Sequence, residues 1–90
     1  MNNIKVENLI ERLSKSDIQN IQLHFEGTIG FDIEIKSFKI KKTTDNIEIY
    51  NKQEQKVVLN IHQIMKVTME SDKEFKILFD GLQSVNICIN

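Results

Sequence analysis

Residues 21–35 read IQLHFEGTIGFDIEI, and this stretch decides the fold. Ile21, Leu23 and Phe25 alternate with polar residues, and the same alternation returns after the second glycine. Successive side chains of a β-strand point to opposite faces, so each half of the stretch predicts a strand with one apolar face. The segment Gly27-Thr28-Ile29-Gly30 between them predicts a turn. Together these features predict an antiparallel hairpin with one buried face.

The apolar positions change parity directly after this hairpin. Ile33 and Ile35 are odd-numbered, whereas the next apolar residues, Phe38 and Ile40, are even-numbered. A shift of one residue turns a side chain to the other face of a sheet. We therefore expect a β-bulge at Lys36-Ser37, which would keep both sets buried and bend the strand. Such bending is typical of small sheets that curl into barrels.

One helix is predicted, and it lies in the first part of the chain. Its apolar residues have the i, i+3, i+4, i+7 spacing of a single helical face: Val6, Leu9, Ile10 and Leu13. Asn2 or Asn3 is expected to cap the start of this helix. The polar run Ser14-Lys15-Ser16-Asp17 is expected to end it, because such side chains compete with helical hydrogen bonds.

Shorter apolar runs predict the remaining strands, at residues 47–49, 57–61, 64–69, 75–79 and 85–89. Fifteen isoleucines and the absence of alanine and proline favour sheet over helix. We therefore expect an α+β fold that is mainly β. One N-terminal helix would pack on a curled antiparallel sheet of five or six strands, forming a small barrel or half-barrel.

The strongest hairpin signal is Asp80-Gly81, which lies between the last two predicted strands. A two-residue loop there would place the apolar rows of the two strands on opposite faces. A loop of three or five residues pairs Ile77 with Val85 or Ile87 and gives one common apolar face. The longer turn is therefore predicted.

The final strand carries Val85, Ile87 and Ile89 on one row, with neither proline nor charge to discourage an incoming strand. We expect these three residues to form a self-association edge in a homodimer. In the alternative, this strand pairs with an earlier one as a barrel closes, which predicts a monomer.

Length and composition limit the class of protein. Ninety residues are expected to make one domain, residues 1–90, and a net charge of -1 argues against nucleic-acid binding over the whole surface. A lone cysteine, Cys88, and apolar runs of at most three residues favour a reducing, cytoplasmic setting. Richness in Ile, Lys and Asn is typical of an AT-rich genome, such as that of a low-GC bacterium, a phage or a mobile element.

Motifs for catalysis or metal binding are missing from the sequence. It has no glycine-rich phosphate loop, no H-E-x-x-H, no G-x-S-x-G and no C-x-x-C, so an enzyme is not expected. His24, His62 and Cys88 are widely separated, whereas zinc sites draw on close pairs, so we expect no metal or other cofactor. Asp32 and Glu34 have the spacing of a metal or acid–base pair, but alternating acids are more typical of a solvent-facing strand row.

Four lysines within seven residues form the densest positive cluster: Lys36, Lys39, Lys41 and Lys42. On a curved strand they could follow a phosphate backbone, with Phe38 or Tyr50 offering a ring on which a base stacks. Lysines also commonly protect an exposed strand from aggregation.

A short helix followed by about five curled antiparallel strands resembles the Sm-like small barrel over residues 4–70. The matching segments are Phe25-Glu26-Gly27, after the first strand, and Asp45-Asn46-Ile47-Glu48-Ile49, before a later one. The resemblance implies a curled barrel, in a family whose rings bind RNA. The glycine that bends the second strand of that family has no counterpart between Lys36 and Thr44. For that reason no functional residue is carried over.

These observations predict a small non-enzymatic interaction module, an accessory or regulatory factor that binds another protein. The sequence does not identify that partner. The alternative is a small barrel that binds single-stranded RNA or DNA with the Lys36–Lys42 strand. A membrane partner is not expected, because the chain has no basic amphipathic helix and no aromatic belt.

Overall fold

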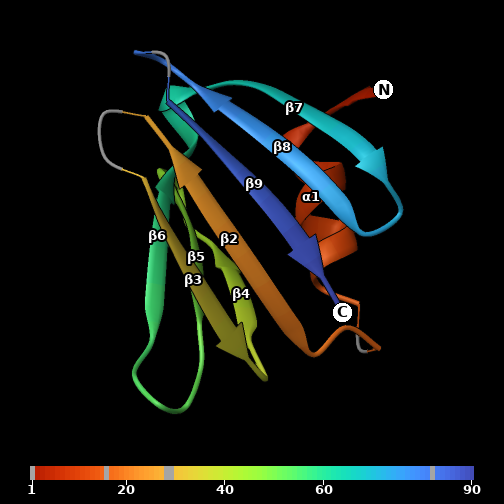
Figure 1. Cartoon of the computed structure of the whole chain (residues 1–90), viewed down its shortest axis with the longest axis vertical. Helices are drawn as coiled ribbons and strands as arrows, with labels where there is room; N and C mark the ends of the chain where they lie inside the picture. Colours follow the sequence, from red (N-terminus) through yellow and green to blue (C-terminus); the bar gives the residue numbers. More distant parts are fainter. Residues whose placement is uncertain (1, 16, 28–29, 82) are drawn as a thin grey trace.

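The computed structural model describes residues 2–15, 17–27, 30–81 and 83–90. These residues form one α-helix, one short 3₁₀ helix and two antiparallel sheets (Figure 1). The elements in chain order are β1 (Asn2–Ile4), α1 (Val6–Leu13), β2 (Asn20–Glu26), β3 (Phe31–Lys36), β4 (Lys39–Lys42), β5 (Asn46–Tyr50), β6 (Lys56–Asn60), η1 (Ile61–Gln63), β7 (Ile64–Ser71), β8 (Glu74–Phe79) and β9 (Gln83–Ile89). Within the described ranges, no helix has the length and apolar character needed to cross a membrane.

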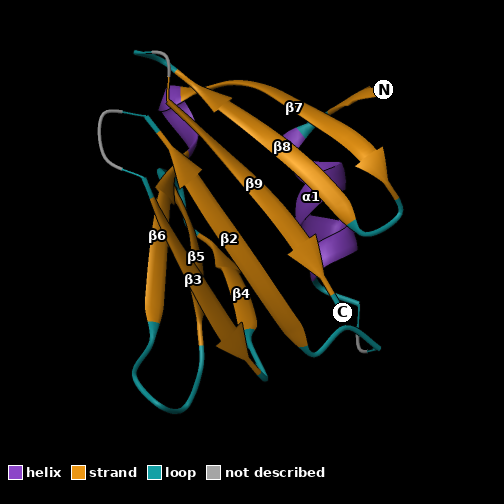
Figure 2. Ribbon diagram, in the orientation of Figure 1, coloured by secondary structure: helices purple, strands orange, loops and turns teal. Residues whose placement is uncertain are grey.

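The strands form two layers. The large sheet has the order β1-β7-β8-β9-β2-β3, and the small sheet has the order β4-β5-β6. Figure 2 shows the small sheet and α1 on the same side of the large sheet. The fold is mainly β with one short helix, as predicted. The six-stranded sheet agrees with the predicted antiparallel sheet of five or six strands. The predicted closure into a barrel is wrong, because three further strands form a second sheet and the strands do not close.

The chain leaves the large sheet at Ser37. This residue has φ 53°, in the left-handed region that residues other than glycine rarely adopt. β3 ends at Lys36, and β4 begins at Lys39 in the small sheet. Ile35 and Phe38 are both buried, so the parity change predicted from the sequence is present. A change of sheet produces it, rather than the predicted bulge within one strand.

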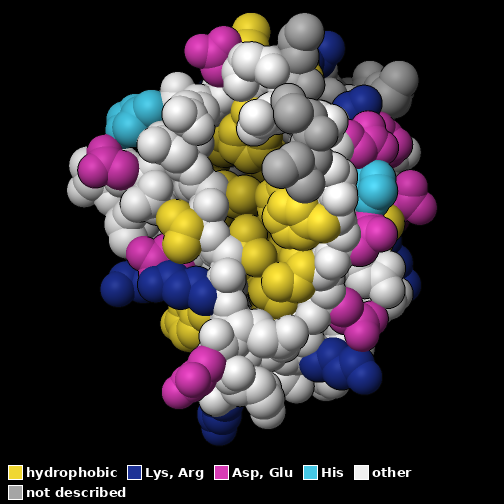
Figure 3. Space-filling model, turned by 60° about the vertical axis from the view of Figure 1, so that its left-hand side comes forward, with side chains coloured by type: hydrophobic (Ala, Val, Ile, Leu, Met, Phe, Trp, Pro, Cys, Tyr) yellow, Lys and Arg dark blue, Asp and Glu magenta, His cyan; other side chains and the backbone are white. Residues whose placement is uncertain are grey.

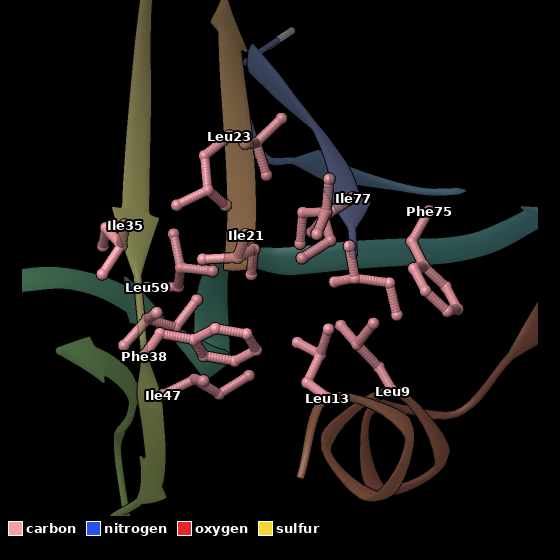
Figure 4. Close-up of a cluster of buried hydrophobic side chains, with 14 of the residues drawn as sticks. Leu9, Leu13, Ile21, Leu23, Ile35, Phe38, Ile47, Leu59, Phe75 and Ile77 are labelled. Atoms are coloured by element: carbon pink, nitrogen blue, oxygen red, sulfur yellow. The ribbon is translucent and has the colours of Figure 1, made fainter. Parts of the chain in front are cut away.

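The hydrophobic core fills the space between the layers. Figure 4 shows Leu9 and Leu13 of α1 pointing toward Ile77 of the large sheet. Ile21 of β2 and Ile47 of the small sheet point into the same cluster. The buried hydrophobic residues described by the structure are Leu9, Leu13, Ile21, Leu23, Ile35, Phe38, Ile47, Ile49, Leu59, Val67, Phe75, Ile77, Val85, Ile87 and Ile89. Removal of this surface from water is the main force that holds the two layers together.

The predicted helix is present, but a strand precedes it. Residues Asn2–Ile4 pair with β7 as an edge strand of the large sheet. The residue that caps α1 is Lys5, and its side chain makes no capping hydrogen bond. The expected cap at Asn2 or Asn3 is therefore wrong, because these residues belong to β1.

The predicted end of the helix is confirmed at Ser14, whose Oγ donates a hydrogen bond of 2.7 Å to the carbonyl of Ile10. Ser16, also in the predicted stop signal, lies outside the described residues. Thr28 and Ile29 of the predicted hairpin turn also lie outside them. The hairpin itself is confirmed, since β2 and β3 pair antiparallel along their length.

The final strand, β9, is an inner strand of the large sheet. Ile77 lies opposite Val85, which confirms the three-residue form of the predicted turn. The other side of β9 pairs with β2, where Ile87 lies opposite Leu23. The prediction that Val85, Ile87 and Ile89 form an exposed self-association edge is wrong, because strands cover both sides of β9 and all three side chains are buried.

We expect Ile87→Lys to unfold the protein. Ile87 is fully buried, and an unpaired buried charge costs several kcal/mol against a total stability of about 5 to 15 kcal/mol. Circular dichroism and thermal melting measure the effect. The matched control is Cys88→Lys, at the next residue, because Cys88 is exposed on the opposite face of β9. An Ile87→Lys protein as stable as this control would contradict the core described above.

Candidate functional site

The side of the molecule between β3 and β6 is open. β3 is an edge of the large sheet and β6 is an edge of the small sheet. A hollow of about 300 Å³ lies between them, and Figure 3 shows hydrophobic side chains exposed in a strip between two polar ridges on this side. Its apolar lining consists of Phe25, Phe31, Val58, Leu59 and Phe79. Its polar rim consists of Glu26, Gly27, Asn60, Gln63, Gln83 and Ser84.

Aromatic side chains form one wall of the hollow. Phe31 is 52% exposed and Val58 is 50% exposed, and both line the same hollow, so they form part of one apolar patch. The rings of Phe25 and Phe31 stack with centroids 4.5 Å apart, which fixes the position of this wall. The third exposed large hydrophobic residue of the described chain, Met65, does not line the hollow.

Side chains from the loop between β5 and β6 cover one half of the free edge of β3. Gln55 Nε2 donates to the Glu34 carbonyl at 3.3 Å, and Asn51 Nδ2 donates to the Lys36 carbonyl at 3.2 Å. Asn51 is itself buried, and its Oδ1 accepts from the Gln55 backbone N–H, so the loop is held in place. The other half of this edge, around Asp32, has no comparable cover from the residues that the structure describes.

A charged cluster lies on the solvent face of β2 and β3, beside the hollow. His24 contacts Asp32 through Nδ1 and Glu26 through Nε2, the second contact at 3.2 Å. The hydrogen bond with Asp32 raises the pKa of His24, and desolvation opposes this rise. The negative charges of Asp32 and Glu26 and the contact with Glu26 add to it, so the pKa is raised overall. Asp32 and Glu34 are both exposed, as expected for a solvent-facing row. The described residues include no group of three or more His, Cys, Asp or Glu arranged to hold a metal ion.

The remaining candidate ligands from the sequence lie in separate places. His62 Nε2 contacts Asp45 Oδ1 at 2.8 Å, and both side chains are exposed. Partial burial raises the pKa of the Cys88 thiol, and the charges of Glu74 and Glu70 raise it further. Because only the thiolate is strongly nucleophilic, this environment makes Cys88 less reactive than an ordinary cysteine.

The change of sheet divides the predicted lysine cluster. Lys36 ends β3, whereas Lys39, Lys41 and Lys42 lie on β4. Strand alternation then places Lys39 and Lys41 on the outer face of the small sheet and Lys42 on the other side of β4. Tyr50 lies directly opposite Lys39, whereas Lys41 lies on the same face opposite Glu48, so the register pairs the predicted ring with one of the four lysines.

Tyr50 has a cation on each side. Its cross-strand neighbours are Lys39 on β4 and Lys56 on β6. A hollow of about 510 Å³ beside it is lined by Ser37, Lys39, Tyr50, Asn51, Lys52 and Gln53. Glu48 contacts Lys56 at 3.0 Å and neutralises part of the charge. Of the two rings named in the sequence, Phe38 is only 8% exposed and belongs to the core, as the parity of Phe38 and Ile40 predicted, which leaves Tyr50.

Comparisons with protein-family models, curated proteins and solved structures found no match to this chain. Its function is therefore argued from the two surfaces described above, the apolar hollow and the Tyr50 face. The sequence predicted the Tyr50 face. It did not predict the hollow, although Val58 gave one signal, as an apolar residue on the otherwise polar row of Lys56 and Asn60.

We expect His24 to titrate above 6.5 in the folded protein, because Asp32 and Glu26 favour its protonated form. A pKa raised by folding means that protonation stabilises the folded state. This stabilisation is fully present below 6.5 and is lost as the pH rises through the folded pKa. An NMR titration of the His24 ring measures the pKa directly. In the Asp32→Asn variant the value should fall toward 6.5; an unchanged value would contradict the assigned cause.

Proposed function

We propose that this protein is a non-enzymatic protein-interaction module whose docking surface is the apolar hollow between β3 and β6. The observation that carries the proposal is the exposure of Phe31 and Val58 at the opening of a hollow of about 300 Å³. In this proposal the protein is an accessory or regulatory factor that acts by binding another protein.

The composition of the hollow supports a docking role. Protein-binding hot spots are apolar or aromatic depressions surrounded by a polar rim that excludes water. Phe25, Phe31 and Phe79 supply the aromatic centre, and Asn60 and Gln83 belong to the rim. A volume of about 300 Å³ suits one large apolar side chain of a partner with part of its backbone.

We expect charged substitutions in the hollow to abolish partner binding selectively. Peptides selected from a displayed random library against the native protein provide ligands, and fluorescence anisotropy measures their affinity. Phe31→Lys should weaken binding by about tenfold or more, because it puts a charge where an apolar anchor packs. Val58→Lys should have a smaller effect in the same direction, because Val58 belongs to the outer row of β6 with Lys56 and Asn60. The control is Met65→Lys, a similarly exposed apolar residue that does not line the hollow.

Folding of all three variants is checked by circular dichroism. Selected peptides that bind the three variants equally well would refute this docking surface. A failure to select any peptide against the native protein would count against the interaction function itself.

A second function, binding of single-stranded nucleic acid, is supported by the position of Tyr50. An aromatic ring flanked by lysines on a sheet surface is the arrangement on which unpaired bases stack while cations contact the phosphates. Here the ring is Tyr50 and the flanking cations are Lys39 and Lys56, with Lys52 beside the same hollow. The proposed contacts therefore differ from the predicted strand. Lys39 and Lys41 share the outer face of the small sheet with Tyr50, whereas Lys36 belongs to β3 and Lys42 lies on the other face of β4.

If this second function holds, short oligouridine or oligothymidine will bind with an affinity that falls steeply with salt. Tyr50→Ala should weaken binding by about tenfold, as expected for one stacked base. The double change Lys39→Glu and Lys41→Glu should abolish it. Lys15→Glu with Lys73→Glu changes the net charge equally, away from Tyr50, and should have a small effect. Equal losses in the two double variants would indicate nonspecific attraction only.

A further inference from the structure

The direction of the backbone groups along β3 follows from its side-chain contacts. The carbonyls of Glu34 and Lys36 accept hydrogen bonds from Gln55 and Asn51, so they point away from β2. In an antiparallel strand the N–H and C=O of one residue point the same way, and alternate residues repeat that direction. The N–H and C=O of Asp32 therefore also point away from β2, toward the open side of the molecule.

The register of the sheet supports this assignment. Residues of β3 whose backbone groups point outward form the non-hydrogen-bonded pairs with β2, in which side chains approach more closely. His24 lies opposite Asp32 in such a pair, and their side chains are in direct contact. Gln22 lies opposite Glu34, and its amide donates to that carboxylate at 3.0 Å.

The exposed half of the β3 edge borders the apolar hollow. Phe31, one residue before Asp32, lines the hollow from β3, while Val58 and Leu59 line it from β6. An extended segment paired with Asp32 would lie between the two sheets. Its residues on either side of that pair would point inward, toward the hollow, because strand side chains alternate.

The charges around this edge are acidic. Glu26 lines the hollow, and Asp32 and Glu34 project from the solvent face of β3, so three carboxylates outnumber the one neighbouring cationic group, His24, which contacts two of them. The described lining residues include no lysine or arginine. An incoming side chain opposite Asp32 on the solvent face would meet these carboxylates, so a basic residue there is favoured.

We propose that the occupant of this surface is an extended peptide segment with a basic residue between two apolar residues. It adds a short strand to β3 at Asp32, places a large apolar side chain in the hollow and sets lysine or arginine against Asp32 and Glu34. This proposal rests on the proposed docking function. It adds the class of ligand, an extended peptide, and the register in which that peptide pairs with β3. Gln55 and Asn51 limit the pairing to the first half of β3.

The test uses a short capped peptide of alternating lysine and apolar residues with phenylalanine at its centre. Binding is measured by fluorescence anisotropy, and pairing is measured by hydrogen exchange of the Asp32 amide. We expect binding to slow exchange at Asp32 by about tenfold or more, because that amide gains a partner. The same peptide with glutamate in place of lysine should bind at least about tenfold more weakly. N-methylation of its pairing amides should also abolish binding.

Two substitutions at one position separate charge from backbone pairing. Asp32→Ala removes the carboxylate and keeps the N–H, and should weaken binding by about threefold. Asp32→Pro also removes the N–H and should cost about tenfold more. Because that N–H points away from β2, proline leaves the β2–β3 ladder intact. The control Glu70→Lys changes the charge of an exposed residue on β7 and should leave binding unchanged.

The outcomes distinguish a failure of the proposed strand pairing from a failure of the proposed docking function. If Phe31→Lys abolishes binding but N-methylation and Asp32→Pro do not weaken it, the hollow docks a partner without strand pairing and this proposal is overturned. Equal binding of the glutamate and lysine peptides overturns the assigned charge. If light scattering finds a dimer that Phe31→Lys dissociates, a second copy of the chain is the occupant instead.

Discussion

The burial of both Ile35 and Phe38 determines the rest of the structure. These residues lie three positions apart and therefore on opposite faces of any continuous strand, so a straight sheet would expose one of them. The left-handed backbone at Ser37 resolves this conflict by turning the chain from the large sheet into the small one. The core is then shared between two layers, and α1 covers the part of the large sheet that the small sheet does not reach. The same turn leaves β3 and β6 as neighbouring edges with an opening between them.

Local patterns were sufficient for most individual elements of this fold. The alternation of Ile21, Leu23 and Phe25 predicted β2, and register arithmetic predicted the pairing of Ile77 with Val85. The arrangement of strands was not predictable in this way. That β9 inserts between β8 and β2 depends on packing between segments far apart in the sequence, and no local periodicity encodes that choice. β1 was missed because three residues are too few to show a period.

The two candidate surfaces differ in how visible they were in the sequence. Lys39, Lys41 and Tyr50 belong to nearby strands, and charge and aromatic character mark them directly. The hollow depends on where two sheet edges meet. Phe31 belongs to the same apolar row of β3 as Ile33 and Ile35. It is exposed because it lies at the open end of that strand. The sequence therefore predicted residues of the charged and aromatic Tyr50 face. It did not predict the apolar hollow, because the hollow exists only where two sheet edges meet.

The central position of β9 also constrains how this protein is made. β2 pairs with β9, a strand far away in the sequence, and Ile21 lies opposite Ile89. During synthesis, β2 and β3 emerge long before the strand that completes their sheet, and their apolar faces lack a covering partner until residues 83–89 have left the ribosome. Sheets built from such distant pairings fold slowly, because a long loop must close before its contacts contribute. Until β9 pairs with β2, these apolar faces are open to aggregation or to capture by chaperones.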